Sequence, residues 1–149
     1  MSLHDDRTKN TDIAKQVARF ERVRKAHQTE VMEDYIELIA DLIDTIGEAR
    51  VVDIAERLGV KNATVTKTLL RLQREKLITS QPYRSIFLTD DGRNLAERIR
   101  QRHKIVLTFL CVIGIRPEVA AIDAEGIEHH VSDDTLYVFE RIINERSEL

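Results

Sequence analysis

Residues 50–76 decide the fold, and they read RVVDIAERLGVKNATVTKTLLRLQREK. A helix-turn-helix needs a small residue where its two helices cross, a glycine in the turn about four residues later, and an apolar anchor about six residues further on. Ala55, Gly59 and Val65 occupy these three positions. The stretch therefore predicts two helices joined by a tight turn. The positions expected to face the core are Ile54, Leu58, Leu69, Leu70 and Leu72.

Short polar side chains gather at the start of the second helix. Asn62 is expected to cap this helix, because its side-chain oxygen can accept a hydrogen bond from a free backbone N–H. Thr64, Thr66 and Lys67 follow in the first turns, where such side chains can enter the major groove of DNA. Arg71 is spaced to reach phosphates. An ordinary pair of antiparallel helices is the alternative, and the basic charge of this region favours DNA binding.

The next stretch, residues 77–89, reads LITSQPYRSIFLT. Two short β-prone runs flank a polar turn that contains Pro82, which predicts a hairpin. A hairpin directly after a recognition helix is the wing of a winged helix, and Arg84 near its tip is placed for the minor groove or the backbone of DNA. Thr89 is expected to cap a linking helix over about residues 90–113.

Charge is distributed unevenly along the chain, whose formal net charge is -3. Residues 48–104 hold 13 Lys and Arg against 7 Asp and Glu, whereas residues 105–149 hold 3 against 9. A basic centre favours contacts with phosphates. Only 5% of residues are aromatic, and two prolines and five glycines leave room for long helices. An all-β fold is therefore disfavoured.

Nothing in the sequence points to a membrane or to secretion. No run approaches about 18 uninterrupted apolar residues, and the N-terminus lacks the apolar region of a signal peptide. The single cysteine, Cys111, excludes an internal disulfide and suits a reducing compartment. We therefore expect a cytoplasmic protein with no membrane partner.

Helical patterns fill the remainder of the chain. Residues 1–28 are strongly charged and are expected to form a flexible extension, with at most a marginal helix. A broad apolar stripe then predicts a helix from Thr29 to Gly47. Pro117 can open a short helix through Ile122, and Ser132 can cap a last helix that has only other helices or a second subunit to pack on.

Carboxylates and imidazoles concentrate in residues 123–130, which read DAEGIEHH. If this stretch is helical, Glu125, Glu128 and His129 share one face. A solvated helix end is the alternative. Asp34 and Glu37 form an i, i+3 pair in the earlier helix, where solvation alone can explain them. A lone histidine beside an apolar stripe, such as His103, is more often a hydrogen-bonded boundary residue than a ligand.

Five motifs together carry a family resemblance: MEDYIE at 32–37, DIAE at 53–56, VTK at 65–67, RH at 102–103 and EGIEHH at 125–130. In this order and spacing, the chain resembles the manganese transport regulators of the diphtheria toxin repressor family from about Thr29 to Arg146. The resemblance implies a homodimeric winged-helix repressor whose affinity for DNA rises when divalent metal binds between its domains. The implied ligands are Asp34, Glu37, His103, Glu125, Glu128 and His129.

The resemblance also bears on the choice of metal. Iron-responsive members of the family place Met and Cys at two ligand positions, where this chain has Asp34 and Glu125. Carboxylate and imidazole ligands favour a harder ion such as Mn²⁺, although Fe²⁺ and other divalent ions can still bind in vitro. Because the site would hold four carboxylates, two ions per subunit are expected.

The expected fold is mostly α with a small β-hairpin wing. Residues 1–28 would be the extension, 29–96 the winged helix-turn-helix domain, and 97–149 the helical metal-binding and dimerisation domain. We expect a manganese-responsive repressor of manganese uptake genes that acts on double-stranded operator DNA and takes no small-molecule substrate. The alternative is a regulator that responds to Fe²⁺ or to a non-metal signal. A metalloenzyme is disfavoured, because the paired Glu-x-x-His motifs of di-iron bundles and the His-Glu-x-x-His string are missing.

Overall fold

In the computed structural model, residues 3–148 are described, with side chains from residue 8 onward, and they form six helices and a two-stranded hairpin. The elements are α1 (Leu3–Ile46), α2 (Val51–Leu58), α3 (Asn62–Arg74), β1 (Ile78–Thr79), β2 (Phe87–Leu88), α4 (Asp90–Val112), α5 (Pro117–Ile127) and α6 (Asp133–Ser147). This order confirms a mostly helical protein with a winged helix-turn-helix followed by a helical C-terminal unit.

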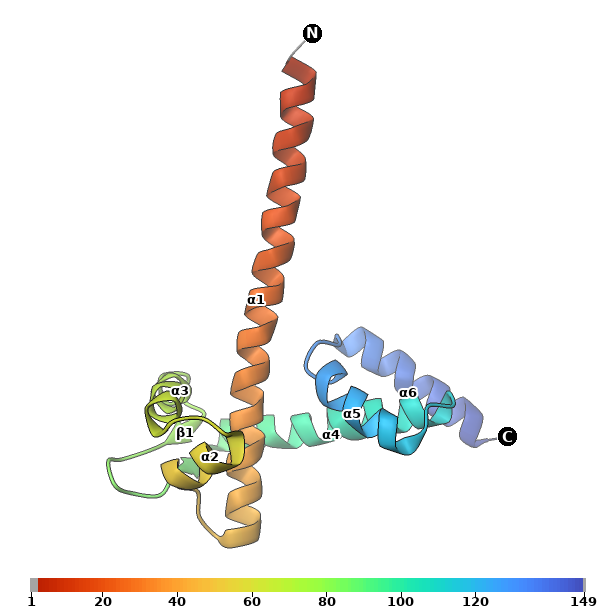
Figure 1. The fold of residues 1–149 in the computed structure, drawn as a ribbon. Helices are drawn as coiled ribbons and strands as arrows, with labels where there is room; N and C mark the ends of the chain where they lie inside the picture. The colour runs from red at the N-terminus through yellow and green to blue at the C-terminus, as the bar shows by residue number, and fades with distance from the viewer. Residues whose placement is uncertain (1–2, 149) are drawn as a thin grey trace.

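Helix α1 begins at Leu3, not at Thr29 as the sequence pattern predicted. Residues 3–46 contain neither proline nor glycine, so the weak helical pattern of the first part continues into the strong one without a break. The first part packs on little: Ile13 is 58% exposed and Phe20 is 53% exposed. Figure 1 shows this half of α1 projecting away from the remainder of the molecule.

The core of the winged helix forms where α1 packs on α2, α3 and the hairpin. Its fully buried side chains come from every one of these elements, and they are Ile36, Ile39, Leu42, Ile54, Val65, Leu72, Ile78 and Ile86. Gly59 ends α2 in the left-handed region, at φ +67°. The predicted turn is therefore confirmed, with a glycine at the position where a side chain would be strained.

Two local predictions about the helix-turn-helix are wrong. Lys61 holds the cap position of α3 and Asn62 is already helical, with no side-chain cap. Asn62 cannot act as the cap because α3 begins at Asn62, one residue earlier than the sequence predicted. Leu70 is 57% exposed rather than buried. Leu69 and Leu72 share the inner face of α3, and Leu70 is rotated by about 100° from Leu69, which turns it outward.

The predicted wing is a short antiparallel hairpin. Ile78 pairs with Leu88 and Thr79 pairs with Phe87. An additional bridge between Ala49 and Ile86 attaches the wing to the segment before α2. The tip carries Tyr83, whose side chain is fully exposed. The hairpin thus packs into the same structural unit as the helix-turn-helix.

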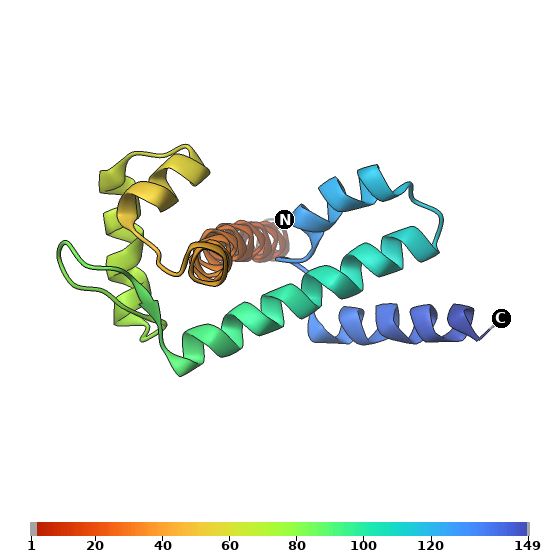
Figure 2. The same ribbon diagram turned by 90° about the horizontal axis from the view of Figure 1, so that it is seen from below.

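Helix α4 links the two halves of the molecule. Thr89 caps it as predicted, and its hydroxyl accepts a hydrogen bond from the backbone N–H of Gly92 at 3.1 Å. The helix crosses α1 and continues to α5 and α6, which lie on the opposite side of α1 from α2 and α3 (Figures 1 and 2). At the crossing, Arg100 pairs with Asp41 at 3.1 Å and with Asp44 at 2.8 Å.

The C-terminal unit has a smaller core between α4, α5 and α6. Its buried members are Val106, Leu110, Ala120, Ala124 and Leu136. Pro117 opens α5 as predicted, but the helix continues past Ile122 to Ile127. Ser132 caps α6 and accepts from the backbone N–H of Thr135. None of the helices in residues 3–148 combines the length and apolarity needed to cross a bilayer.

Candidate metal centre

His129 lies in the turn after α5 and is buried against α1. Its Nδ1 atom is 2.8 Å from Oε2 of Glu33, and its Nε2 atom is 3.2 Å from Oδ1 of Asp34. The hydrogen bond to Asp34, and to a smaller extent the one to Glu33, raises the pKa of the imidazole to about 10, although burial alone would lower it. At neutral pH the ring therefore carries two protons and sits between two carboxylates.

Glu128 is the most deeply buried charged residue of the cluster, at 1% exposure. Its Oε2 atom accepts a hydrogen bond from Nδ1 of His103 on α4. Its Oε1 atom lies 3.6 Å from Nε2 of His129 and has no hydrogen-bond partner among the described residues. Burial raises the pKa of this carboxyl, and the contact with His103 opposes that shift. A buried oxygen without a partner is costly unless a cation or a proton compensates for it.

Glu37 and Glu125 add further negative charge. Burial raises the pKa of Glu37, and the carboxylates of Glu125, Asp41 and Asp34 raise it further, while His103 lowers it. Glu125 is exposed and acts on Glu37 through its charge. All six candidate ligands are thus linked by contact or by charge, from α1, α4 and the end of α5.

As they stand, no three or more His, Cys, Asp and Glu side chains in residues 8–148 are arranged so that they could hold a metal ion. The imidazoles and carboxylates are instead paired with one another. The donor chemistry nevertheless fits a divalent cation: hard oxygens and imidazoles, an excess of carboxylates, and the unpartnered Oε1 of buried Glu128. The extra proton on His129 occupies the edge of the ring that faces Asp34.

Two residues of this cluster are not among the ligands predicted from the sequence. Glu33 is 7% exposed and contacts His129, although it was not among the candidates. Arg102 lies within 3.5 Å of Glu33 Oε1 and donates to the backbone oxygen of Glu128 at 3.4 Å. The available signal was spacing, since Glu33 precedes Glu37 by four residues and so shares its helix face.

The predicted DNA contacts are exposed on α3 and the wing, except for Arg71. Asn62, Thr66 and Arg84 line one groove of about 760 Å³ between the two elements. Thr64 and Lys67 are also exposed on the first turns of α3. Five of the six candidates therefore lie on the outer surface of the winged helix.

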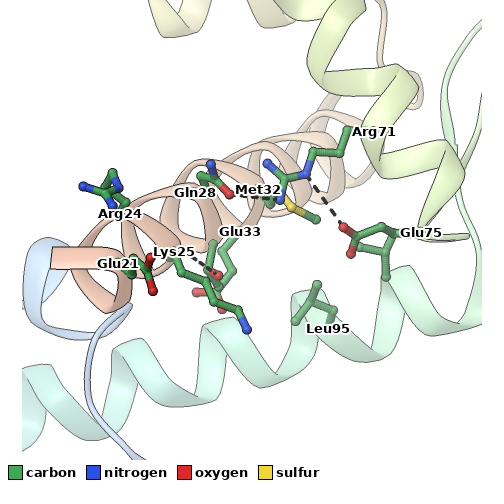
Figure 3. A pocket seen from close by; sticks show the side chains of 11 residues that line it. Glu21, Arg24, Lys25, Gln28, Met32, Glu33, Arg71, Glu75 and Leu95 are labelled. Atoms are coloured by element: carbon green, nitrogen blue, oxygen red, sulfur yellow. Dashed lines mark hydrogen bonds and ion pairs between the residues drawn. The ribbon is translucent and has the colours of Figure 1, made fainter. Parts of the chain in front are cut away.

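Arg71 lies elsewhere, in a crevice of about 710 Å³ that α1, α3 and α4 enclose (Figure 3). Its Nη2 atom is 3.5 Å from Oε1 of Gln28, and its Nε atom is 3.7 Å from Glu75. In this position the guanidinium turns toward α1 and away from the outer surface. A phosphate contact by Arg71 would require the side chain to leave these partners.

A winged helix, a helix that links it to a second helical unit, and a cluster of carboxylates and imidazoles between them define a metal-responsive DNA-binding transcriptional regulator. Two family models match the chain. Residues 27–86 match the iron dependent repressor, N-terminal DNA binding domain, and residues 89–147 match its metal binding and dimerisation domain. The chain belongs to this family, that of the diphtheria toxin repressor, and the resemblance seen in the sequence is confirmed.

Relatives support the same assignment. The transcriptional regulator MntR of Escherichia coli O6:H1 is 51% identical over 132 residues, covering 89% of this chain and 85% of that protein. The HTH-type transcriptional regulator MntR of Listeria monocytogenes serotype 4a is 43% identical over 104 residues, covering 70% and 73%. Sequence and family models therefore agree over both halves of the chain.

Solved structures are similar as well. A manganese-dependent transcriptional repressor in complex with manganese has a TM-score of 0.67 and 27% identity, over 76% of this chain and 52% of its own. The manganese regulator SloR has a TM-score of 0.65 and 25% identity, over 76% and 53%. The chain thus spans about half the length of these two structures.

Proposed function

We propose that this protein is a manganese-responsive repressor of manganese uptake genes. The observation that carries the proposal is the partly buried network in which Asp34, His129, Glu128 and His103 join α1, the turn after α5, and α4. The names of the relatives and of the solved structure with manganese support the choice of ion. Relatives are named as transcriptional regulators, which supports a regulator and not an enzyme.

The proposed ligands are Asp34, Glu37, His103, Glu125, Glu128 and His129. We propose two ions per subunit, because four carboxylates carry a charge of about -4 when ionised, and Glu128 touches both imidazoles and can serve as a shared ligand. Neither Met nor Cys stands among the six ligands, which favours Mn²⁺ over softer ions. Selectivity against Fe²⁺ then depends on geometry and on the supply of metal in the cell.

The mechanism follows from where these side chains originate. Asp34 and Glu37 stand on α1, which forms the core of the winged helix, whereas Glu125, Glu128 and His129 belong to the C-terminal unit. When bound, divalent metal supplies the positive charge that the carboxylates lack. The six side chains then hold α1 and the C-terminal unit in one arrangement, and this arrangement fixes the position of α3 relative to the second subunit.

The spacing between two recognition helices must match half-sites about one or more helical turns apart on DNA. The metal-bound arrangement is proposed to have that spacing. The fraction of dimers in this arrangement rises as metal binds. By thermodynamic linkage, operator DNA increases the affinity for metal by the same factor by which metal increases the affinity for DNA.

We propose that the chain has two functional domains and an N-terminal extension. We assign residues 29–96 to DNA binding and residues 97–149 to metal binding and dimerisation, with residues 1–28 as an extension of α1. The boundary falls within α4, which packs on both cores. The dimer is proposed to act in the cytoplasm, together with the DNA that it binds.

A chelator titration tests the proposal. Operator fragments selected from a random DNA pool with the Mn²⁺-loaded protein are labelled, and their binding is followed by fluorescence anisotropy with Mn²⁺, with Fe²⁺ under anaerobic conditions, or with excess EDTA. Tight binding with Mn²⁺ that EDTA abolishes is the expected result. Equally tight binding in EDTA would overturn the metal switch, and activation by Fe²⁺ without any activation by Mn²⁺ would overturn the choice of ion.

A further inference from the structure

We propose that Glu33, held in place by Arg102, is a positioning residue that aims Nε2 of His129 at the metal site. This inference rests on the proposed function, because it assumes that His129 binds divalent metal. Neither Glu33 nor Arg102 is among the six proposed ligands. Their role would be to set the affinity of the site through the orientation of one imidazole.

The two nitrogens of His129 face different partners. Nδ1 lies 2.8 Å from Oε2 of Glu33, while Nε2 faces Oδ1 of Asp34 at 3.2 Å and Oε1 of Glu128 at 3.6 Å. The hydrogen bond that one ring nitrogen makes decides which nitrogen is free to bind metal. With Nδ1–H donated to Glu33, Nε2 is the atom left for a cation, and it already points at two further proposed ligands.

Glu33 is itself fixed from the other side. Its Oε1 atom lies 3.5 Å from Nη1 of Arg102, and the same nitrogen donates to the backbone oxygen of Glu128 at 3.4 Å. Arg102 therefore connects the carboxylate that orients His129 with the backbone of the neighbouring ligand. Because Glu33 is 7% exposed, water competes little for these contacts, and the hydrogen bonds are stronger than they would be at the surface.

Glu33 is a partner of the ligand and does not bind the metal itself in this arrangement. Its Oε2 atom contacts Nδ1 of His129 and its Oε1 atom contacts Nη1 of Arg102, whereas Asp34 and Oε1 of Glu128 face the other ring nitrogen, Nε2. Carboxylates in this position are common behind metal-binding histidines, where they fix the ring and raise its basicity. Glu33 stands in the same relation to His129, since it contacts the ring nitrogen opposite the proposed ligand atom Nε2.

Helix α1 offers a matched control one turn earlier. Glu30 also contacts an imidazole, with Oε2 3.0 Å from Nε2 of His130, but this pair is more exposed and His130 is not a proposed ligand. Glu30→Ala therefore removes a carboxylate–imidazole contact of the same kind without touching His129. Glu33→Gln is a second comparison, because its amide oxygen can still accept the hydrogen bond from Nδ1–H.

The experiment measures Mn²⁺ dissociation constants from the electron paramagnetic resonance signal of free Mn²⁺, without DNA. Glu33→Ala is expected to weaken Mn²⁺ binding by about 10- to 100-fold. Glu33→Gln should recover most of this loss, and Glu30→Ala should match the wild type. In the diamagnetic Zn²⁺-loaded protein, long-range ¹H–¹⁵N NMR should show the His129 proton on Nδ1, and this single tautomer should be lost in Glu33→Ala.

The outcomes separate the two proposals. If wild type binds Mn²⁺ and Glu33→Ala binds it equally well with the same tautomer, the role of Glu33 is overturned while the proposed function stands. If the wild type itself does not bind Mn²⁺, the proposed function fails. Should Glu33→Ala not fold, Glu33→Met, which keeps the side-chain volume, is judged by the same criteria.

Discussion

Nε2 of His129 lies 3.2 Å from Oδ1 of Asp34, so an imidazole of the C-terminal unit meets a carboxylate of the first helix. Asp34 and Glu33 together raise the pKa of this imidazole to about 10. The second proton of the ring lies on Nε2, the nitrogen that we propose as the metal ligand. In this cluster, proton and divalent cation are therefore competitors for one position.

This competition predicts how metal affinity depends on pH. Since His129 keeps its second proton up to a pKa of about 10, the cation that binds Nε2 of His129 must displace this proton, and the apparent affinity for that Mn²⁺ ion should rise by up to about tenfold per pH unit between pH 7 and pH 9. Calorimetric titration in buffers of different ionisation enthalpy measures the protons released. Full activation of DNA binding at pH 5 would contradict His103 and His129 as ligands.

The same proton affects the stability of the metal-free protein. The pKa of His129 is raised by folding from its ordinary value of 6.5 to about 10, so its contribution to stability is complete below pH 6.5 and is lost as pH rises through 10. In EDTA, the melting temperature of the wild type should therefore fall over this range more than that of His129→Gln. Parallel pH profiles of the two proteins would contradict the assignment.

Removing a proposed ligand should abolish the response to metal without unfolding the protein. Glu125→Ala and His129→Ala are expected to lose at least about 100-fold in Mn²⁺ affinity, more than a partner residue behind the ligands would cost. Glu125 is exposed, so its substitution should leave the helical circular dichroism unchanged. An unchanged Mn²⁺ response of operator binding in either variant would remove that residue from the site.

Contacts with phosphates are tested through their dependence on salt. Lys67→Ala on α3 and Arg84→Ala on the wing should weaken operator binding, and each should reduce the slope of log affinity against log salt by about 1. Arg116→Ala is the control, because this exposed arginine lies at the start of α5, far along the chain from the winged helix. A salt slope equal to that of wild type would place the substituted residue off the DNA.

Among the five glycines, Gly92 is the one where an added Cβ atom would meet neighbouring backbone. A Cβ atom at this position would lie 2.0 Å from the backbone oxygen of Leu77, so Gly92→Ala should lower the free energy of unfolding by about 3 kcal/mol or more. Gly126→Ala is the matched control, since its Cβ meets nothing within 4 Å and should stabilise α5 by up to about 1 kcal/mol. Urea denaturation in EDTA measures both. Equal stability of the two variants would contradict the packing of α4 on the wing.

The first half of α1 should be far less protected than the second. Residues 8–20 are exposed throughout, whereas residues 32–42 include Ile36, Ile39 and Leu42 in the core. Hydrogen exchange in the metal-free protein should therefore be orders of magnitude faster in residues 8–20, where opening breaks few apolar contacts. Equal protection along α1 would mean that the projecting half is covered in solution and is no flexible extension.

Most local predictions are confirmed where the interacting residues are close in the chain. Thr89 and Ser132 cap the helices predicted for them, and Gly59 forms the turn that the spacing required. Two errors were also local: Asn62 lies one residue inside its helix, and Leu70 faces outward. Both concern a shift of a single residue, which hydrophobic pattern alone resolves poorly.

The sequence by itself determined the winged helix-turn-helix and the linking helix, because helix periodicity, capping and turn chemistry act between residues only a few positions apart. The six candidate ligands came from the family resemblance of its motifs and not from these local patterns. Only the tertiary structure decided how these ligands pair. Glu33 looks like one more charged residue of a helix until the turn after α5 places His129 against it and α4 brings Arg102. Burial and charge compensation depend on which helices cross, and no local spacing encodes that.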